Sequence, residues 1–228
     1  RFMTITYYGH SCFGVKTNNC SILFDPFIRP NELARDINID SISADYIVVT
    51  HGHSDHVADL EYIAKRTNAK VISNFEIIQW CSKMGIENAH AMNTGGKFAF
   101  EFGTIKSVFA AHSSSLPDGS YGGNPNGYII KSGGKSIYYA GDTALSNEMK
   151  LIGDYDQIDL AFLPIGDNFT MGVKDAITAA GFVGCNEVIG MHYDTFPPIK
   201  LDGEKAIKDF NSKGVNLQLM SIGATIEI

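Results

Sequence analysis

One short segment constrains the fold of this chain more than any other, because an apolar run leads directly into a polar cluster. Residues 46–50, which read YIVVT, are apolar almost throughout. A continuous run of this kind predicts a strand in a sheet that is covered on both faces. Residues 51–56, which read HGHSDH, follow at once. The pattern therefore predicts a group of imidazole and carboxylate side chains at the end of a buried strand.

The rest of the chain alternates between β-rich and helical patterns. Strands are expected at residues 3–8, 11–16, 21–25, 46–50, 70–73, 104–111, 127–131, 136–140, 159–164, 187–191 and 217–221. Helices are expected after residue 54, with Ser54 or Asp55 as N-cap, and at residues 76–84, 173–182 and 203–211. This order favours a layered α/β fold with two central sheets and outer helices over one doubly wound sheet. No linker divides residues 1–228, so one domain is expected.

Composition narrows the classes of function. The 228 residues carry 18 Lys and Arg against 25 Asp and Glu, a formal net charge of −7, and no basic run stands out. Nucleic-acid binding needs a clustered positive surface, so it is not expected. The first residues resemble a strand and not the apolar block of a signal peptide, and no apolar run is long enough to span a membrane, so a cytoplasmic protein is expected. The four cysteines form no CxxC pair and are expected to be buried thiols; homo-oligomer formation is left open.

The polar cluster has the composition of a metal site. Imidazole and carboxylate groups bind first-row divalent ions, and three His and one Asp fall within residues 51–56. If this segment stays extended, His51 and His53 point the same way, whereas Asp55 and His56 turn toward a second position as a helix begins. These are more ligands than one ion needs. A His-rich surface loop is the alternative, and the preceding buried strand makes it the weaker interpretation.

HGHSDH matches the HxHxDH signature of the metallo-β-lactamase superfamily, and the chain resembles this superfamily over nearly its whole length. His112 follows a strand, Asp142 lies in AGDT, and His192 ends GMH, in the order of the superfamily's later ligands. The resemblance implies a four-layered αββα sandwich. It also implies one ion held by His51, His53 and His112, a second held by Asp55, His56 and His192, and Asp142 as the bridge between them.

Four further segments resemble the ascorbate-6-phosphate-lactonase-like branch of the superfamily. They are YGHSCF at residues 8–13, DP at 25–26, GDNFTMG at 166–172 and MHYDTFP at 191–197. Other branches are less similar: flavo-diiron reductases carry Glu where this chain has His53, and secreted β-lactamases usually carry Cys in place of Asp142. Thioesterases of this fold append a helical region for which the chain has little room.

The resemblance implies a hydrolase with two divalent ions, Zn or Mn, that cleaves an ester-like bond of a small molecule, a lactone or a phosphodiester. Two neighbouring ions acidify a bridging water, so hydroxide is available at neutral pH. A diiron redox protein or a thioesterase of the same fold is the alternative, and a non-catalytic metal-binding protein is a third class. The candidate catalytic residues are Asp55, which is also an expected ligand, and His10. His10 would be a substrate contact, a proton donor or a structural His.

Other side chains have two interpretations each. Asp25 precedes a proline, so it either orients a metal-binding imidazole or begins a turn. Asp167, Asn168, Thr170 and Met171 follow a buried strand and either form a pocket wall or serve in packing and turn-making. His90 lies in a polar connection and is expected at the surface.

Two loops are expected to form the rim of the metal cleft, because they follow directly on predicted ligands. Residues 113–126 are rich in Gly and small polar side chains and contain Tyr121. Residues 192–200 contain Tyr193 and Lys200, which are expected to contact an anionic group of the substrate. The alternative is that both loops are ordinary connections.

Overall fold

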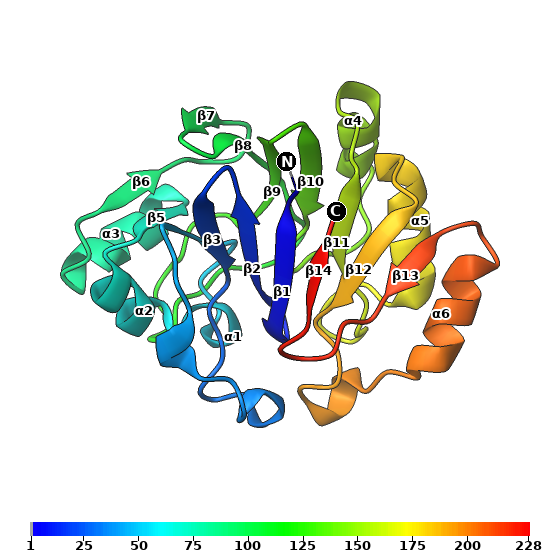
Figure 1. Cartoon of the computed structure of the whole chain (residues 1–228), viewed down its shortest axis with the longest axis horizontal. Helices are drawn as coiled ribbons and strands as arrows, with labels where there is room; N and C mark the ends of the chain where they lie inside the picture. Colours follow the sequence, from blue (N-terminus) through cyan, green and yellow to red (C-terminus); the bar gives the residue numbers. More distant parts are fainter. Residues whose placement is uncertain (1) are drawn as a thin grey trace.

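The computed structural model describes residues 2–228 as two sheets packed face to face, with helices on the outer side of each (Figure 1). Rings from the two sheets meet in the layer between them: Phe24 stacks on Tyr139 with centroids 4.4 Å apart, and Phe13 meets Phe162 edge-on at 4.9 Å. This is the αββα sandwich that the sequence resemblance implies, and the expectation is confirmed.

The first sheet has the strand order β14-β1-β2-β3-β4-β5-β6. Neighbouring strands from β14 to β3 are antiparallel, and those from β3 to β6 are parallel. The bounds are β1 Thr4–Gly9, β2 Cys12–Thr17, β3 Cys20–Phe24, β4 Tyr46–Val48, β5 Lys70–Ser73, β6 Ala89–Ala91 and β14 Thr225–Glu227.

The second sheet has the order β13-β12-β11-β10-β9-β8-β7. Strands β7 to β10 are antiparallel to their neighbours, and β10 to β13 are parallel, so the pattern of the first sheet recurs. The bounds are β7 Lys97–Phe100, β8 Gly103–Phe109, β9 Asn126–Ser132, β10 Lys135–Tyr139, β11 Leu160–Pro164, β12 Glu187–Met191 and β13 Asn216–Gln218.

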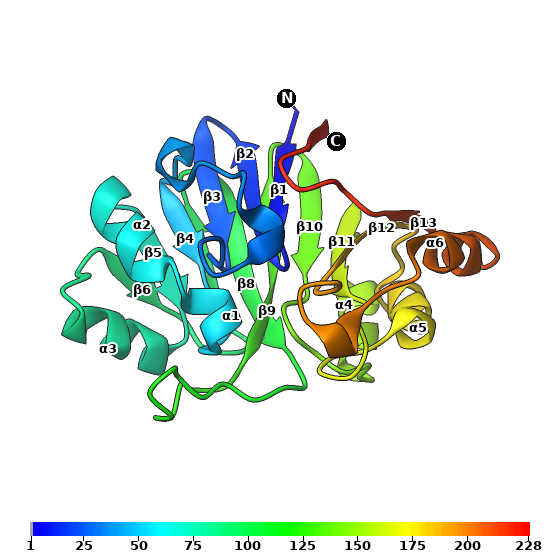
Figure 2. The ribbon, with the colours of Figure 1, turned by 90° about the horizontal axis from the view of Figure 1, so that it is seen from below.

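Helices α1 to α3 lie beside the first sheet and α4 to α6 beside the second (Figure 1, Figure 2). Their bounds are α1 Ser54–Val57, α2 Leu60–Thr67, α3 Phe75–Lys83, α4 Glu148–Tyr155, α5 Val173–Val183 and α6 Gly203–Asn211. Short 3-10 turns cover Glu32–Ala34, Ile39–Ser41 and Pro197–Ile199. In the described part of the chain, no helix combines the length and the apolar character that crossing a membrane requires.

Two hydrophobic clusters hold these layers together. The larger one fills the space between the sheets and continues under α4 to α6, with Tyr138 and Phe210 among its fully buried members. The smaller one lies between the first sheet and α2 and α3, where Leu60 and Ile77 pack. All four cysteines are buried free thiols.

Several local expectations are wrong. The helical pattern after the HGHSDH segment is two helices, because the chain breaks between α1 and α2 at Asp59. The carboxylate of Asp59 accepts hydrogen bonds from the backbone N–H groups of Ile28 and Arg29, at 2.7 and 2.9 Å. Neither Ser54 nor Asp55 is the N-cap, since α1 begins at Ser54 and the preceding residue makes no side-chain cap.

His90 is also misplaced by the sequence analysis. It lies half-buried in β6, with its ring centroid 4.3 Å from that of Phe98 and 5.1 Å from that of Phe100. Strand β7, which supplies both rings, was not expected either, nor were β6, α4 and β14.

Candidate metal centre

The expected donor residues, together with the candidates His10 and Asp25, all follow strands of the two sheets. In the first sheet they come after β1, β3 and β4, which run parallel to one another, and in the second after β8, β10 and β12. Because equivalent ends of parallel strands meet at one edge of a sheet, the donors gather at a single edge of the sandwich. In this strand order, the residues are His10, Asp25, the segment 51–56, His112, Asp142 and His192.

One group of donors consists of His51, His53, His112 and Asp142, whose ligand atoms lie within 4.8 Å of one another. Nε2 of His51 is 3.1 Å from Nδ1 of His53. The other nitrogen of His53, Nε2, is 3.1 Å from the hydroxyl of Ser113. The structure thus brings together the three imidazoles that the sequence resemblance assigns to the first ion.

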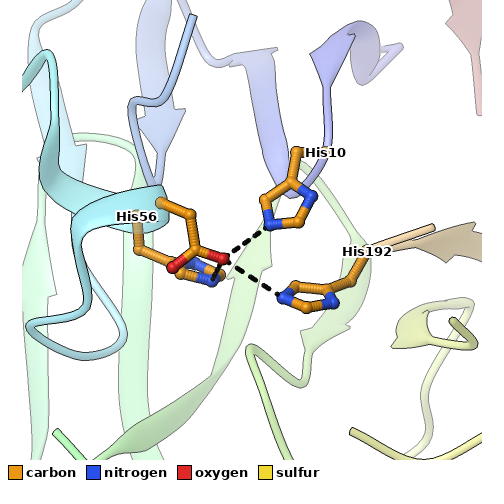
Figure 3. Close-up of side chains that lie close together, drawn as sticks. His10, His56 and His192 are labelled. Atoms are coloured by element: carbon orange, nitrogen blue, oxygen red, sulfur yellow. Dashed lines mark hydrogen bonds and ion pairs between the residues drawn. The ribbon is translucent and has the colours of Figure 1, made fainter. Parts of the chain in front are cut away.

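A second group consists of His10, Asp55, His56 and His192, again within 4.8 Å. Figure 3 shows His10, His56 and His192 converging from three different segments. Oδ2 of Asp55 lies 3.5 Å from Nε2 of His56 and 3.4 Å from Nε2 of His192. The group contains the three residues assigned to the second ion and adds His10.

Asp142 lies between the two groups and is almost fully buried. Its Oδ2 atom is 3.6 Å from Nε2 of His51 and 3.4 Å from Nε2 of His112. The same oxygen is 3.1 Å from Nε2 of His56 and 3.0 Å from Nε2 of His192. One carboxylate oxygen is therefore shared by imidazoles from both groups.

The residues fit a divalent metal ion by their chemistry and by their unmet hydrogen bonds. Oδ1 of Asp142 and both ring nitrogens of His192 are buried without a hydrogen bond from any described residue. The 3.0 Å approach of His192 to Asp142 is a charge contact, since its geometry is not that of a hydrogen bond. Each buried polar atom left without a partner costs about 1–3 kcal/mol, and coordination to a cation would remove that cost.

Asp25 lies behind the two groups and fixes the orientation of two imidazoles. Its carboxylate accepts hydrogen bonds from the backbone N–H and the hydroxyl of Thr50, at 2.8 and 2.7 Å, and from Nδ1 of His56 at 2.7 Å. The Thr50 hydroxyl in turn accepts from Nδ1 of His51 at 2.8 Å. Nδ1 of each imidazole is therefore a donor to this network, and Nε2 of each faces Asp142, with Nε2 of His56 within hydrogen-bond distance of Oδ2 at 3.1 Å.

His10 lies behind Asp55. Its Nε2–H donates to Oδ2 of Asp55 at 2.8 Å. Burial lowers the pKa of His10 to about 4, so the ring is neutral and its Nδ1 accepts a hydrogen bond. The hydroxyl of Thr195, 2.6 Å away, supplies that bond in preference to the carbonyl of Tyr193 at 3.3 Å.

The electrostatics of the cluster favour positive charge. Burial works to raise the pKa of Asp142, but His56 and His192 outweigh it and hold that pKa well below its usual range. Burial likewise works to lower the pKa of His192, yet the charge of Asp142 outweighs it and raises the pKa to about 9. The Asp142 carboxylate thus stays ionised and His192 is drawn toward the cationic form, whereas burial lowers the pKa values of His51, His53 and His112 and favours their neutral form.

A cavity of about 700 Å³ opens onto the donors. Apart from donors, it is lined by two serines, three phenylalanines and two prolines: Ser54, Ser113, Phe27, Phe169, Phe196, Pro30 and Pro198. His10 is not part of this lining and borders a separate, smaller cavity on its other side. The interpretation of His10 as a substrate contact is therefore not supported by its position.

The two expected rim loops differ: residues 192–200 contribute Phe196 and Pro198 to the lining of the cavity, whereas most of residues 113–126 lies away from it. Within residues 113–126 only Ser113 lines the cavity, while Tyr121 is 67% exposed. The loop is held by hydrogen bonds, with the Ser114 hydroxyl accepting from the backbone N–H of Gly52 at 3.0 Å. Tyr193 borders the smaller cavity and Lys200 a groove beside α5 and α6, so neither of the two side chains expected to contact an anionic group lines the metal cavity.

Sequence reasoning missed several residues that surround the donors. Thr50 ends the apolar run and gave no separate signal, although its hydroxyl connects Asp25 to His51. Thr195 lies 185 positions from its partner His10. Of the aromatic lining, only Phe169 adjoins residues that were considered as a pocket wall.

Comparison with known proteins agrees with this site. A family described as the beta-lactamase superfamily domain matches residues 4–192. A UPF0173 metal-dependent hydrolase of Christiangramia forsetii is 51% identical over 227 residues, covering 99% of this chain and 100% of that protein. The UPF0173 metal-dependent hydrolase YtkL of Bacillus subtilis is 46% identical over 231 residues, with coverage of 99% and 100%.

A solved structure is similar over the whole chain. Igni18, a metallo hydrolase from the archaeon Ignicoccus hospitalis, has a TM-score of 0.91 at 33% sequence identity, covering 100% of this chain and 99% of that one. The fold, the donor groups and these relatives together define the class: the chain belongs to the metallo-β-lactamase superfamily. Within that class it is an enzyme, a metal-dependent hydrolase.

Proposed function

We propose that the chain hydrolyses an ester-like bond of a small molecule, a lactone or a phosphodiester, with a pair of divalent ions, Zn or Mn. The ligands of one ion would be His51, His53 and His112, and those of the other Asp55, His56 and His192. Asp142 would serve both. The sequence similarity to ascorbate-6-phosphate-lactonase-like proteins supports the lactone alternative.

The position of the Asp142 carboxylate supports two ions over one. Its Oδ2 atom lies within 3.6 Å of four imidazole nitrogens, two from each donor group. A single ion accepts about four protein ligands, whereas this cluster offers seven. When bound, a divalent pair supplies Lewis acidity, which lowers the pKa of water and polarises the bond under attack.

The protein's own residues prepare the site for this chemistry. Asp25 and Thr50 keep the protons of two imidazoles on Nδ1, so that the Nε2 atom of each would be available to a metal ion. His10 holds Oδ2 of Asp55 in place from behind. Ser113 is no candidate nucleophile, because its partner His53 turns its other nitrogen to His51 and not to a carboxylate.

Metal analysis and a substrate panel test the proposal. Protein purified without chelator should contain two divalent ions per chain, and elemental analysis at saturation measures this directly. Loaded in turn with Zn, Mn and Fe, it should hydrolyse lactones or phosphodiesters in a panel that also contains thioesters. One ion at saturation would refute the dinuclear site, and turnover of thioesters alone, or redox activity of an iron form alone, would refute the proposed reaction.

A further inference from the structure

We propose that the substrate is a neutral lactone or carboxylic ester that carries an apolar, ring-sized group against an aromatic wall of the metal cavity. The wall is defined as Phe27, Phe169 and Phe196. The inference rests on the proposed function, because it concerns the substrate of the same site. It favours the lactone over the phosphodiester, and it departs from the anionic group expected from the sequence.

The lining of the cavity combines candidate metal donors with apolar side chains. The donors on it are His53, Asp55, His112, Asp142 and His192. The other lining residues are the three phenylalanines of the wall, Pro30, Pro198, Ser54 and Ser113. Ligand sites of this kind bind through their apolar surface, while a few polar groups fix the orientation of the ligand.

A hydrogen-bonded turn at Asp167 and Asn168 places Phe169 at the cavity. Asp167 and Asn168 both adopt left-handed backbone conformations, with φ of 62° and 63°. The N–H of Phe169 donates to the carbonyl of Asp167 at 2.7 Å, and the N–H of Asn168 to the Asp167 carboxylate at 2.9 Å. Two successive non-glycine residues in this region carry a conformational cost, yet the ring they present is 53% exposed. An exposed ring on such a turn points to a ligand that covers it.

The other two rings are fixed by His10. Phe27 and Phe196 each meet its ring edge-on with centroids 5.4 Å apart. Phe196 also directly precedes the two prolines that begin the 3-10 turn Pro197–Ile199, whose backbone is stiff. These two rings are therefore preorganised, which reduces the entropy lost when an apolar group packs on them.

Positive side chains that could bind an anion lie elsewhere. None of the described residues that line the cavity is Lys or Arg. Arg29 is adjacent in sequence to the lining, but its Nε donates to Asp59 at 2.6 Å and its guanidinium lies 4.3 Å from the ring centroid of Tyr62. Lys200 borders the groove beside α5 and α6. A negative group on the substrate's tail would thus be desolvated against rings without a counter-charge.

Binding of metal-directed probes tests the inference without a hydrolysis assay. The probes are propanohydroxamic acid and its derivatives with a terminal phenyl or a terminal carboxylate, titrated into Zn-loaded protein by calorimetry. The phenyl probe should bind roughly 10- to 100-fold more tightly than the parent, which is the gain from burying one aromatic ring. The carboxylate probe should bind no more tightly than the parent.

Variants of the wall locate the effect. Phe169→Ala and Phe196→Ala should each weaken the phenyl probe by roughly 3- to 10-fold while leaving the parent probe and the metal content unchanged. Phe75→Ala is the matched control, because Phe75 is similarly exposed, at 50%, but lies on α3 outside the cavity lining. It should change the affinity for neither probe.

The outcomes separate this inference from the proposed function. Equal affinity for phenyl and parent probes, or tightest binding of the carboxylate probe, would overturn the inference even if hydrolysis were found. Failure of every probe to bind metal-loaded protein would overturn it too, since the cavity would not give access to the ions. A clear preference for the phenyl probe, without hydrolysis of any lactone, carboxylic ester or phosphodiester, would refute the proposed function and leave only the aromatic binding site standing.

Discussion

Replacing Asp25 by Asn should weaken metal binding while the fold is retained. Asn has nearly the same shape and tolerates the left-handed backbone of this position, where φ is 44°. The amide can still accept from the Thr50 N–H, but its NH₂ group would face Nδ1 of His56, which now donates to Oδ2 at 2.7 Å. His56 would then carry its proton on Nε2, on the side of the metal.

The magnitude follows from the two imidazoles that the carboxylate controls. Loss of one outer hydrogen-bond partner of a metal ligand typically costs about 10- to 100-fold in metal affinity or activity. His56 loses its acceptor directly, and His51 is affected through the Thr50 hydroxyl. We therefore expect the upper part of that range, about 100-fold, which corresponds to about 2.7 kcal/mol.

Competition with a chromophoric chelator measures the metal affinity of the variant. The hydrolysis rate is measured in parallel at a saturating metal concentration. Asp59→Asn is the matched control, since Asp59 is also a buried carboxylate and accepts from Ile28 N, Arg29 N and Arg29 Nε, but contacts no imidazole. It should change stability and leave metal affinity within about twofold of wild type. Wild-type affinity and rate in Asp25→Asn would show that imidazole orientation by this carboxylate is unimportant.

Three further results are expected. His112→Ala should remove one of two ions and lower hydrolysis by more than about 100-fold, whereas His90→Ala should keep both; full metal content in the first variant would contradict the ligand assignment. Thr195→Val should lower kcat by about tenfold with metal content unchanged, because His10 loses the donor that fixes its tautomer, and Thr195→Ser should restore it; equal kcat in all three proteins would exclude the role. Chelation should lower the melting temperature by roughly 8–16 °C in scanning calorimetry, because bound ions should add about 4 kcal/mol to the free energy of unfolding. An unchanged melting temperature would mean that the ions do not bind the native state at that strength.

The sequence predicts best what depends on local pattern. The apolar run at residues 46–50 contains strand β4, and the HGHSDH segment with its candidate donors follows the end of that strand, as the sequence pattern predicts. His112, Asp142 and His192 were identified from the order of a family motif, because a lone His after a strand has no distinctive spacing of its own. Their approach to one another depends on two sheets that no local pattern places in space.

The errors have physical causes in tertiary packing. Helix α4 was missed because Gly153 interrupts its pattern, but a Cβ at this position would lie 2.3 Å from the carbonyl of Phe182, so close packing against α5 requires glycine. The aromatic wall was missed because its rings come from three segments far apart in the chain. Thr195 and His10 likewise form a pair only in the folded protein.

The matching strand orders of the two sheets give the chain two halves of one plan. In each half, an antiparallel group of strands leads into a parallel group. Helices connect the last three parallel strands of each half, which are β4, β5 and β6 in the first and β11, β12 and β13 in the second. Equivalent places can therefore be compared: His10 after β1 with His112 after β8, and Asp25 after β3 with Asp142 after β10.

The residues at equivalent positions have different roles. In the first pair, His112 faces the proposed ions, whereas His10 donates a hydrogen bond to the Asp55 carboxylate from behind. In the second pair, Asp142 lies between the two donor groups, whereas Asp25 accepts the proton of an imidazole Nδ1. The connection after β4 carries HGHSDH, while its counterpart after β11 carries the turn that presents Phe169 to the same cavity. The first half brings four of the seven expected donors and Phe27 of the wall, and the second brings three donors with Phe169 and Phe196, so neither could form the site as an isolated unit.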